Sequence, residues 1–325
     1  MSKEKKTSSM GRSNLLVDLF RKKPLGGVGL IIMILFLLVA IFADVLAPYP
    51  MQNGTMQMDF TAILSGPTAA HPLGTDSLGT DVLSYLIYGA RTSVVLGIVC
   101  TILCTIISVV IGVSSAVIGG WFDLIVQRIV DGFQCIPSLL IMLMMMAAMG
   151  KGMPQLIVAL SMPAGIGGAR IIRSAAFSVK DSGYVKMSKL LGTGTLWRAV
   201  KHVIPNTLPL IIVNMAGNLS GVIMQEASLN FLGYGVKIGT PSWGYMITNQ
   251  GRANMYTAPW LSLYPGLCIM ILVFGANMFG DAIRDLLDPR LQGGVGSYNT
   301  KKIKKIAAKM MAKRERQLRK EQNPA

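Results

Sequence analysis

The sequence predicts an all-α, polytopic integral membrane protein with six transmembrane helices and both termini in the cytoplasm. Of its 325 residues, 52% are hydrophobic and only 14% are charged, whereas soluble domains carry about 25% charged residues. Six apolar runs are separated by polar segments, and the Lys and Arg residues gather on alternate segments. Apolar length and charge asymmetry are the two signals that define membrane topology.

The first predicted span is the run at 25–46, which follows the cationic triplet Arg21-Lys22-Lys23. A hydrocarbon core about 30 Å thick is crossed by about 20 apolar residues in a helix. The run is too long, and lacks a cleavage site of small residues, to be a removed signal peptide. Because Lys and Arg are retained on the inner side, the triplet places residues 1–24 in the cytoplasm.

Five further spans are predicted at 93–119, 136–150, 154–169, 208–232 and 260–280. The runs at 136–150 and 154–169 are short. Within the latter, Pro163 stands among three glycines, and a proline inside a helix bends it. We therefore expect a distorted fourth helix.

These spans place the connecting segments alternately on the two sides of the membrane. The four predicted cytoplasmic segments, 1–24, about 120–135, 170–207 and 281–325, hold 27 of the 31 Lys and Arg residues. The outside segments hold the other four, at Arg91, Lys151, Lys237 and Arg252. The predicted parts are a basic segment at 1–24, a helix and outside loop at 25–92, a five-helix core at 93–290 and a basic tail at 291–325.

The tail holds ten Lys and Arg residues between Lys301 and Lys320. It either forms an amphipathic helix on anionic membrane lipid, where each cation contributes about 1 kcal/mol, or stays solvated and sets the topology. We favour the solvated tail. The net charge of +16 does not indicate nucleic-acid binding, because the cations flank membrane spans and no basic folded domain is present.

Neither a metal site nor a catalytic site is expected in this chain. Its four cysteines lie in or beside apolar runs without paired spacing, and it has two histidines, His71 and His202. No G-x-x-x-x-G-K-[ST] phosphate loop occurs, so ATP and Mg²⁺ are expected only in partner subunits. Signatures of metalloproteases and serine hydrolases are also missing.

The predicted cytoplasmic loop at 170–207 carries the strongest functional signal. It holds seven cations against one acid, Asp181. A helix starting near Asp181 would break at Gly192, and a second short helix would end before Pro205. A rigid helix–turn–helix on a membrane face suits insertion into a partner's groove, whereas an ordinary basic loop explains the charges alone. The residues we assign to this site are Tyr184, Lys186, Met187, Ser188, Gly192, His202 and Pro205.

A second motif lies in the predicted outside loop and repeats Gly-Thr-Asp five residues apart. Its glycines and acids predict tight turns in which Asp side chains accept from nearby backbone amides. Metal binding is the alternative, but one histidine and two acids in turns more often have a structural role. The residues of this motif are His71, Gly74, Asp76, Gly79 and Asp81.

Glu226 is the ionisable residue that stands out inside a predicted span. Acids within a membrane are functional by default. It could contact solute, relay protons or bond to a neighbouring helix. Because it lies near the outer rim, where desolvation is partial, we favour a structural or gating role.

Taken together, the motifs resemble the C-type permease subunits of ABC importers of the dipeptide, oligopeptide and nickel family. The string from His71 to Ser84 resembles their HPLGTD signature, and the segments at 226–244 and 285–291 continue the match. Gly192 and Pro205 have the spacing of the family's Glu-Ala-Ala coupling motif. The triplet itself is Lys186-Met187-Ser188 here, so the charge of the family's glutamate is inverted.

The resemblance implies a type I ABC importer permease fold in the cell membrane. It further implies a heterodimer with a second permease, two cytoplasmic ATP-binding subunits and an external substrate-binding protein. Lys186 then indicates either an ATPase that has compensated or weaker coupling. Di- or oligopeptides are the favoured cargo, with nickel or other small solutes as the alternative. An ion-coupled secondary transporter is less favoured, since no internal repeat is evident, and so is an intramembrane enzyme or scaffold.

Overall fold

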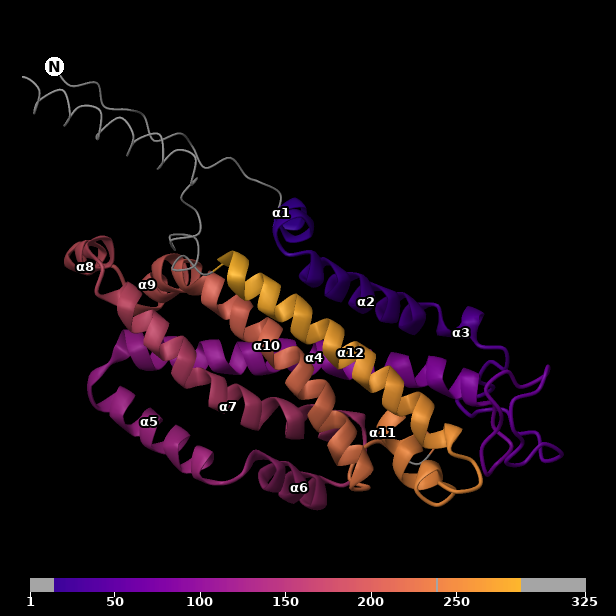
Figure 1. The fold of residues 1–325 in the computed structure, drawn as a ribbon. Helices are drawn as coiled ribbons and strands as arrows, with labels where there is room; N and C mark the ends of the chain where they lie inside the picture. The colour runs from indigo at the N-terminus through magenta and orange to yellow at the C-terminus, as the bar shows by residue number, and fades with distance from the viewer. Residues whose placement is uncertain (1–14, 238, 288–325) are drawn as a thin grey trace, which may run out of the picture. The chain divides into compact units, whose positions relative to one another are not determined.

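Apolar helices long enough to cross a membrane dominate the computed structural model, which describes residues 15–237 and 239–287 (Figure 1). Five such helices are present, at Pro24–Ile41 (α2), Val82–Ile118 (α4), Met153–Lys180 (α7), Thr195–Phe231 (α9, η1 and α10) and Trp260–Leu287 (α12). A sixth span results if Gly120–Cys135 (α5) and Ser138–Met149 (α6), which meet at an angle of 89°, cross together. The all-α prediction is confirmed, and the described residues form no β-strand.

Short helices connect or flank these spans. They are Leu15–Lys22 (α1), Ala43–Leu46 (α3), Gly183–Leu190 (α8), Thr195–Arg198 (α9) and Trp243–Met246 (α11). Two π-helical turns lie at Ala199–Val203 (η1) and Ile247–Gly251 (η2). The first of them leads directly into the long helix Ile204–Phe231 (α10). Three parts of the sequence predictions lie outside the described residues. They are residues 1–14 of the predicted basic segment, Asp288, and the predicted basic tail at 291–325. The chain divides into units of residues 1–284 and 285–325, and only Asp285–Leu287, the end of α12, are described in the second.

The second span begins eleven residues earlier than the predicted Ser93, because Asp81 caps the helix. Its Oδ2 accepts from the Ser84 amide at 2.8 Å and from the Ser84 hydroxyl at 2.7 Å. The polar side chains of the first turns are also paired. Arg91, for example, donates to the Ala40 carbonyl and to Asp44 at 2.9 and 2.8 Å. The predicted boundary between residues 92 and 93 therefore falls inside one helix.

The segment predicted only as a connection at about 120–135 is a helix, α5. Helix α7 ends at Lys180, eleven residues beyond the predicted end at 169. Its additional turns carry arginines that bind acidic residues of α5. Arg173 makes two bonds of 2.6 and 2.5 Å to Asp123, and Arg170 pairs with Asp131. Such bidentate Arg–carboxylate pairs are among the stronger polar contacts. Hydropathy alone missed α5 because its charges lower the apolar average.

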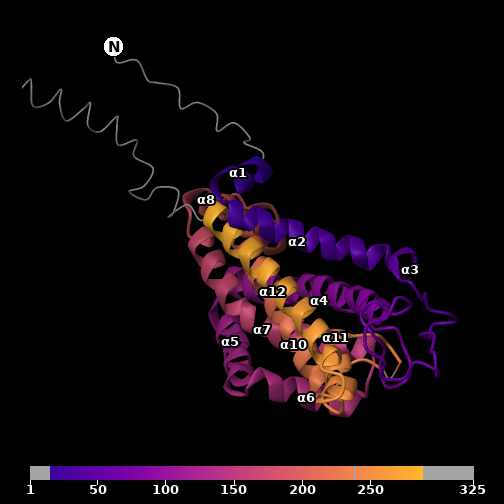
Figure 2. The same cartoon turned by 45° about the vertical axis from the view of Figure 1, so that its right-hand side comes forward.

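Helix α4 packs against α7 through small residues. The Ser108 hydroxyl on α4 donates to the Gly165 carbonyl on α7 at 2.7 Å, and α7 continues through Pro163 without interruption. A Cβ at Gly112 would lie 2.6 Å from the Ala169 carbonyl oxygen. In membranes, where no hydrophobic force drives helix association, small residues permit this close backbone approach. In both views α2 runs alongside α12 (Figures 1 and 2).

Gly112→Ala should weaken the α4–α7 crossing. The added methyl must displace backbone atoms of α7, and overpacking of this kind costs about 1–3 kcal/mol. Gly217→Ala is the matched control, because a Cβ at Gly217 on α10 meets nothing within 4 Å. We expect the first variant, and not the second, to lower the thermal unfolding midpoint of the detergent-purified chain. Equal midpoints would contradict the close crossing.

Candidate functional site

Residues predicted to bind a partner form a structured projection between α7 and α10. We call residues Gly183–Val203, which contain α8, α9 and η1, the knob; Figure 1 shows α8 at one extremity of the helices of this unit. The knob's base is anchored, since Ala199 and Val203 are buried against Val113, Ala116 and Ile172. Its continuation, α10, begins directly after Val203.

Gly192 ends α8 in a left-handed conformation with φ of +78°. The Gly192 amide bonds to the Lys189 carbonyl at 3.1 Å, and the Thr193 amide bonds to the Ser188 carbonyl at 3.2 Å. These two bonds are the Schellman pattern, which satisfies the free carbonyls at a helix end. The Ser188 and Thr193 hydroxyls, 2.7 Å apart, close the turn. A Cβ at Gly192 would meet nothing within 4 Å, so the positive φ is the reason for glycine.

His202 joins the two arms of the knob. Its ring packs edge-on against Trp197 at 5.0 Å and Tyr184 at 6.1 Å between centroids. Pro205 lies just after the π-helical turn at Ala199–Val203. The helical segment continues through it from Thr195 to Phe231, so the predicted helix end before Pro205 is wrong. The knob is therefore held by local contacts, and its helix α8 ends at Gly192 as the sequence predicts.

Apolar side chains cover the exposed surface of the knob. In the sequence, the visible signal of the loop at 170–207 is the charge of its seven cations. Leu190 and Leu196 are 81% and 78% exposed. We call the exposed apolar residues the tip; they are Met187, Leu190, Leu191, Leu196, Trp197 and Val200. Lys186 pairs with Asp181 of the same chain at 3.4 Å. An apolar patch of this kind on a protein surface marks an interaction site.

At the far end of α4 and α10, the loop at 47–81 and the segment at 242–258 form a hydrogen-bonded layer, which we call the cap. His71 and Asp81 are both buried, and His71 Nδ1 lies 3.1 Å from Asp81 Oδ1. Tyr49 stacks on the His71 ring at 4.9 Å. Asp81 thus orients the histidine with one oxygen and caps α4 with the other. Gly74 and Gly79 turn the chain with φ of +83° and +75°.

Asp76 ties the two halves of the cap together. Its Oδ1 accepts from the amides of Leu78 and Thr80 at 2.8 and 2.7 Å, which is the turn geometry that the spacing predicts. Its Oδ2 accepts from the Gln250 amide at 2.7 Å, across 174 residues of sequence. The Gln250 oxygen in turn accepts from Ser77 N and Oγ, both at 3.1 Å. Gln250 carried no signal in the sequence, since a lone glutamine in a loop belongs to no motif.

Burial raises the pKa of the Asp76 carboxyl above its usual value, although the amides of Thr80 and Leu78 act in the opposite direction. His71, Asp76 and Asp81 are each satisfied by protein groups. Among the residues that the structure describes, no group of three or more His, Cys, Asp or Glu side chains could hold a metal ion.

Glu226 is 1% exposed and bound on three sides. Its carboxylate accepts from Asn230 at 2.5 Å, from Ser242 at 3.1 Å and from Ser93 at 3.3 Å. These partners come from α10, the residue before α11, and α4. Asn230 also accepts from the Val236 amide at 2.9 Å, so the network holds the cap's second half on the helix ends.

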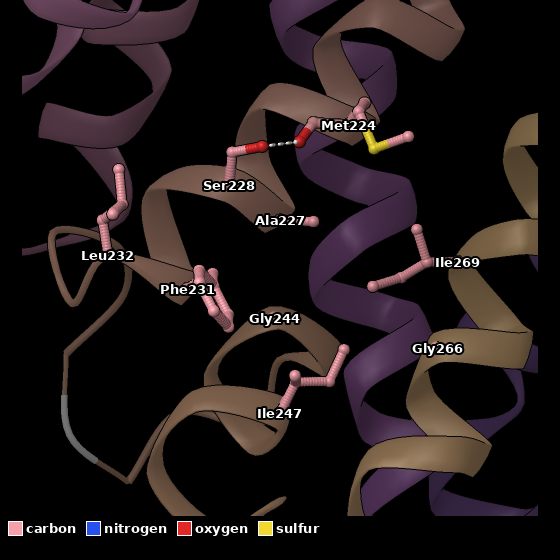
Figure 3. Close-up of a pocket in the computed structure, with 9 residues that line it drawn as sticks. All are labelled: Met224, Ala227, Ser228, Phe231, Leu232, Gly244, Ile247, Gly266 and Ile269. Atoms are coloured by element: carbon pink, nitrogen blue, oxygen red, sulfur yellow. Dashed lines mark hydrogen bonds between the residues drawn. The ribbon is translucent and has the colours of Figure 1, made fainter. Parts of the chain in front are cut away.

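Beside this network lies an apolar cavity of about 390 Å³. Figure 3 shows its lining from α10, α11, η2 and α12, with the Ser228 hydroxyl bonded to the Met224 carbonyl at 2.8 Å. The lining residues are Met224, Ala227, Ser228, Phe231, Leu232, Gly244, Ile247, Gly266 and Ile269. Because its one hydroxyl is already paired, this cavity presents a hydrocarbon-like surface.

A set of long apolar helices with a structured knob and a hydrogen-bonded cap defines a multi-pass membrane transport subunit. The chain belongs to the family of binding-protein-dependent transport system inner membrane components, which it matches at residues 108–293. Residues 17–67 match the N-terminal transmembrane domain of oligopeptide transport permease C. The chain is accordingly a permease subunit of an ABC importer, and such subunits are not themselves enzymes.

Similar proteins span most of the chain. The glutathione transport system permease protein GsiD of Shigella flexneri is 32% identical over 274 residues, which cover 84% of this chain and 89% of that protein. The dipeptide transport system permease protein DppC of Alkalihalophilus pseudofirmus is 33% identical over 272 residues, covering 84% and 88%. An inward-facing structure of the MetNI methionine ABC transporter shares the fold, with a TM-score of 0.51 at 19% identity over 63% of this chain and 96% of that one.

Gln250→Ala should loosen the cap. It removes three hydrogen bonds and leaves a buried carboxylate oxygen of Asp76 unpaired, which costs about 1–3 kcal/mol or more. Asn249→Ala is the control, since Asn249 bonds only at the exposed Tyr245 hydroxyl. Limited proteolysis within 47–81 should be faster in the Gln250 variant alone. Equal cleavage rates in both variants would contradict the bridge.

Asp76→Asn should flatten the pH dependence of stability. A raised folded-state pKa means that the stability contributed by protonated Asp76 is complete below about pH 3.8 and is lost as pH rises through the folded pKa. The wild-type chain should therefore lose stability over this interval, and the variant should lose less. Thermal unfolding from pH 3.5 to 7 compares the slopes, and parallel slopes would exclude the contribution of Asp76.

Proposed function

We propose that this chain is the membrane-spanning subunit of an ATP-driven importer of di- or oligopeptides. It would form the translocation path with a second permease and work with two ATP-binding subunits and an external substrate-binding protein. The exposed apolar tip of the knob is the observation that carries the coupling role. The cargo is supported by two relatives, which are permease proteins of a glutathione and a dipeptide transport system. Nickel or another small solute is the second candidate, and an ion-coupled secondary transporter is the third.

The knob is the proposed site of contact with an ATP-binding subunit. Ser188, Gly192 and Pro205 set its shape, and Tyr184 and His202 brace its two arms. Met187 and its apolar neighbours would enter the partner's groove. Lys186 is already paired with Asp181, so the contact would rely on apolar burial more than on charge. Exposed ion pairs contribute only about 0–1 kcal/mol, whereas a buried leucine contributes about 1.5–3 kcal/mol.

The proposed orientation places the knob in the cytoplasm and the cap outside. The knob carries an excess of Lys and Arg, as cytoplasmic segments do. The cap, with His71, Gly74, Asp76, Gly79 and Asp81 at its centre, would then face the substrate-binding protein. Glu226 would hold the cap on the helix ends and move with it during gating. ATP and Mg²⁺ would bind in the partner subunits.

Truncation of the tip tests this assignment. Leu190→Ala combined with Leu196→Ala should weaken ATPase binding at least about tenfold, since full burial of a leucine side chain contributes about 1.5–3 kcal/mol and tenfold corresponds to about 1.4 kcal/mol. We expect loss of copurifying ATPase and of ATP-driven dipeptide uptake in proteoliposomes. Leu78→Ala, a change to an exposed leucine of the cap, should retain the ATPase. Undiminished ATPase recovery with the tip variant would refute the coupling site, and uptake driven by an ion gradient without ATPase would indicate a secondary transporter.

A further inference from the structure

The bend between α5 and α6 interrupts regular backbone structure beside the middle of α7. Figures 1 and 2 show the two helices turning next to α7. Pro163 and Gly167, which line the cavity at this bend, follow the start of α7 by 10 and 14 residues. At 1.5 Å per residue they lie about 15 and 21 Å along a helix about 42 Å long. The bend therefore lies beside the middle of α7, which is a candidate membrane span.

Backbone groups at the bend lack partners. Within the described part of the chain, the carbonyls of Gln134, Cys135 and Ile136 accept no hydrogen bond, and the amides of Ser138 and Leu139 donate none. Lipid hydrocarbon cannot satisfy such groups, each of which costs several kcal/mol there. Irregular backbone within the hydrocarbon region is tolerated only inside protein or along a water-filled cavity. This face of the chain does not suit lipid.

A cavity of about 280 Å³ opens at the bend. The Gln134 amide reaches into the wall and donates to the Gly167 carbonyl at 3.3 Å, and a Cβ at Gly167 would meet nothing within 4 Å. The lining carries amide, hydroxyl and backbone groups but no ionisable side chain. Its residues are Phe133, Gln134, Ile136, Pro137, Ser138, Ile141, Pro163, Ile166 and Gly167.

Two other cavities offer no unpaired polar side chain in their lining. The cavity of Figure 3 has its hydroxyl paired, and the one of about 240 Å³ between α2, α4, α10 and α12 is lined by apolar side chains alone. An apolar helix of a second permease would fill either of those, but it would leave the carbonyls at the bend unsatisfied. Water and a solute with amide groups would satisfy them.

We propose that the cavity at the α5–α6 bend is a hydrated contact site for the transported solute, which it binds through the solute's peptide backbone. This inference rests on the proposed function. The site offers neutral donors and acceptors in place of charges, with the Gln134 amide and the Ser138 hydroxyl beside the open backbone groups. Contacts of this kind recognise C=O and N–H groups and are indifferent to solute side chains.

Cysteine labelling tests hydration and occupancy together. Thiolates form in water, so a charged methanethiosulfonate should modify Ser138→Cys at least about tenfold faster than Met144→Cys in the reconstituted complex. Met144 lies on the same helix and is 68% exposed, but it is outside the cavity. Both variants are made with Cys135 and Cys268 replaced by serine, after this background has been shown to take up dipeptide. Saturating dipeptide with its binding protein should slow labelling of the cavity cysteine.

Several outcomes would overturn the proposal. Equal, slow labelling of both positions places the bend in lipid or in a dry interface. Fast labelling that dipeptide leaves unchanged means that the cavity is hydrated but is not a contact site. If Ser138→Cys fails to assemble, Ile136→Cys in the same background gives the same readout, because Ile136 is exposed and lines the cavity. A wild-type complex that takes up no dipeptide refutes the proposed function instead, while hydration at the bend is still measured.

Gln134→Leu gives an independent readout. Loss of one neutral hydrogen bond should raise the half-saturating dipeptide concentration about 2- to 10-fold, with ATPase copurification unchanged. Gln127→Leu is the control, because Gln127 lies on the same helix and bonds to Ser115 away from the cavity. Unchanged half-saturation in the Gln134 variant would remove this residue from the contact site.

Discussion

Pairing of peptide groups is the constraint on which the structure depends. Hydrocarbon offers no hydrogen bonds, so the chain crosses it as long helices whose backbone groups pair internally. Polar side chains within these helices are satisfied by neighbours, as with Arg173 on Asp123 and Ser108 on the Gly165 carbonyl. The α5–α6 bend departs from this constraint, because the carbonyls of Gln134, Cys135 and Ile136 are unpaired.

One continuous helical segment connects the knob and the cap. Thr195–Phe231 begins inside the knob and reaches the network of Glu226 and Asn230 beneath the cap. Its 37 residues span about 56 Å as a helix. This helical rod is not uniform, because the π-helical turn at Ala199–Val203 and the prolines Pro205 and Pro209 lie near its knob end. The buried knob base at Val203 and the bonds around Glu226 fasten the two ends of this rod to α4.

Much of the knob and cap could be predicted because their determinants are local. Gly192 marks a helix end at short range, and Asp76 bonds to amides two and four residues away. The predicted helix end before Pro205 is wrong, because the helical segment continues into α10. Gln250 could not be predicted, since its partner is 174 residues distant and no local pattern marks it. The start of α4 at Val82 was missed for a similar reason: its polar first turns look like loop until their distant partners are known.

The sequence by itself determined the membrane class, the apolar helices and the positions of the motifs, because apolar length and turn residues act over a few residues. Tertiary structure alone decided which surfaces are exposed and which polar groups are paired. It turned the basic loop into a knob with an apolar tip, buried Glu226 among its partners and left the backbone open at the α5–α6 bend. These features depend on contacts between residues far apart in the chain, and such contacts are formed only when the helices pack.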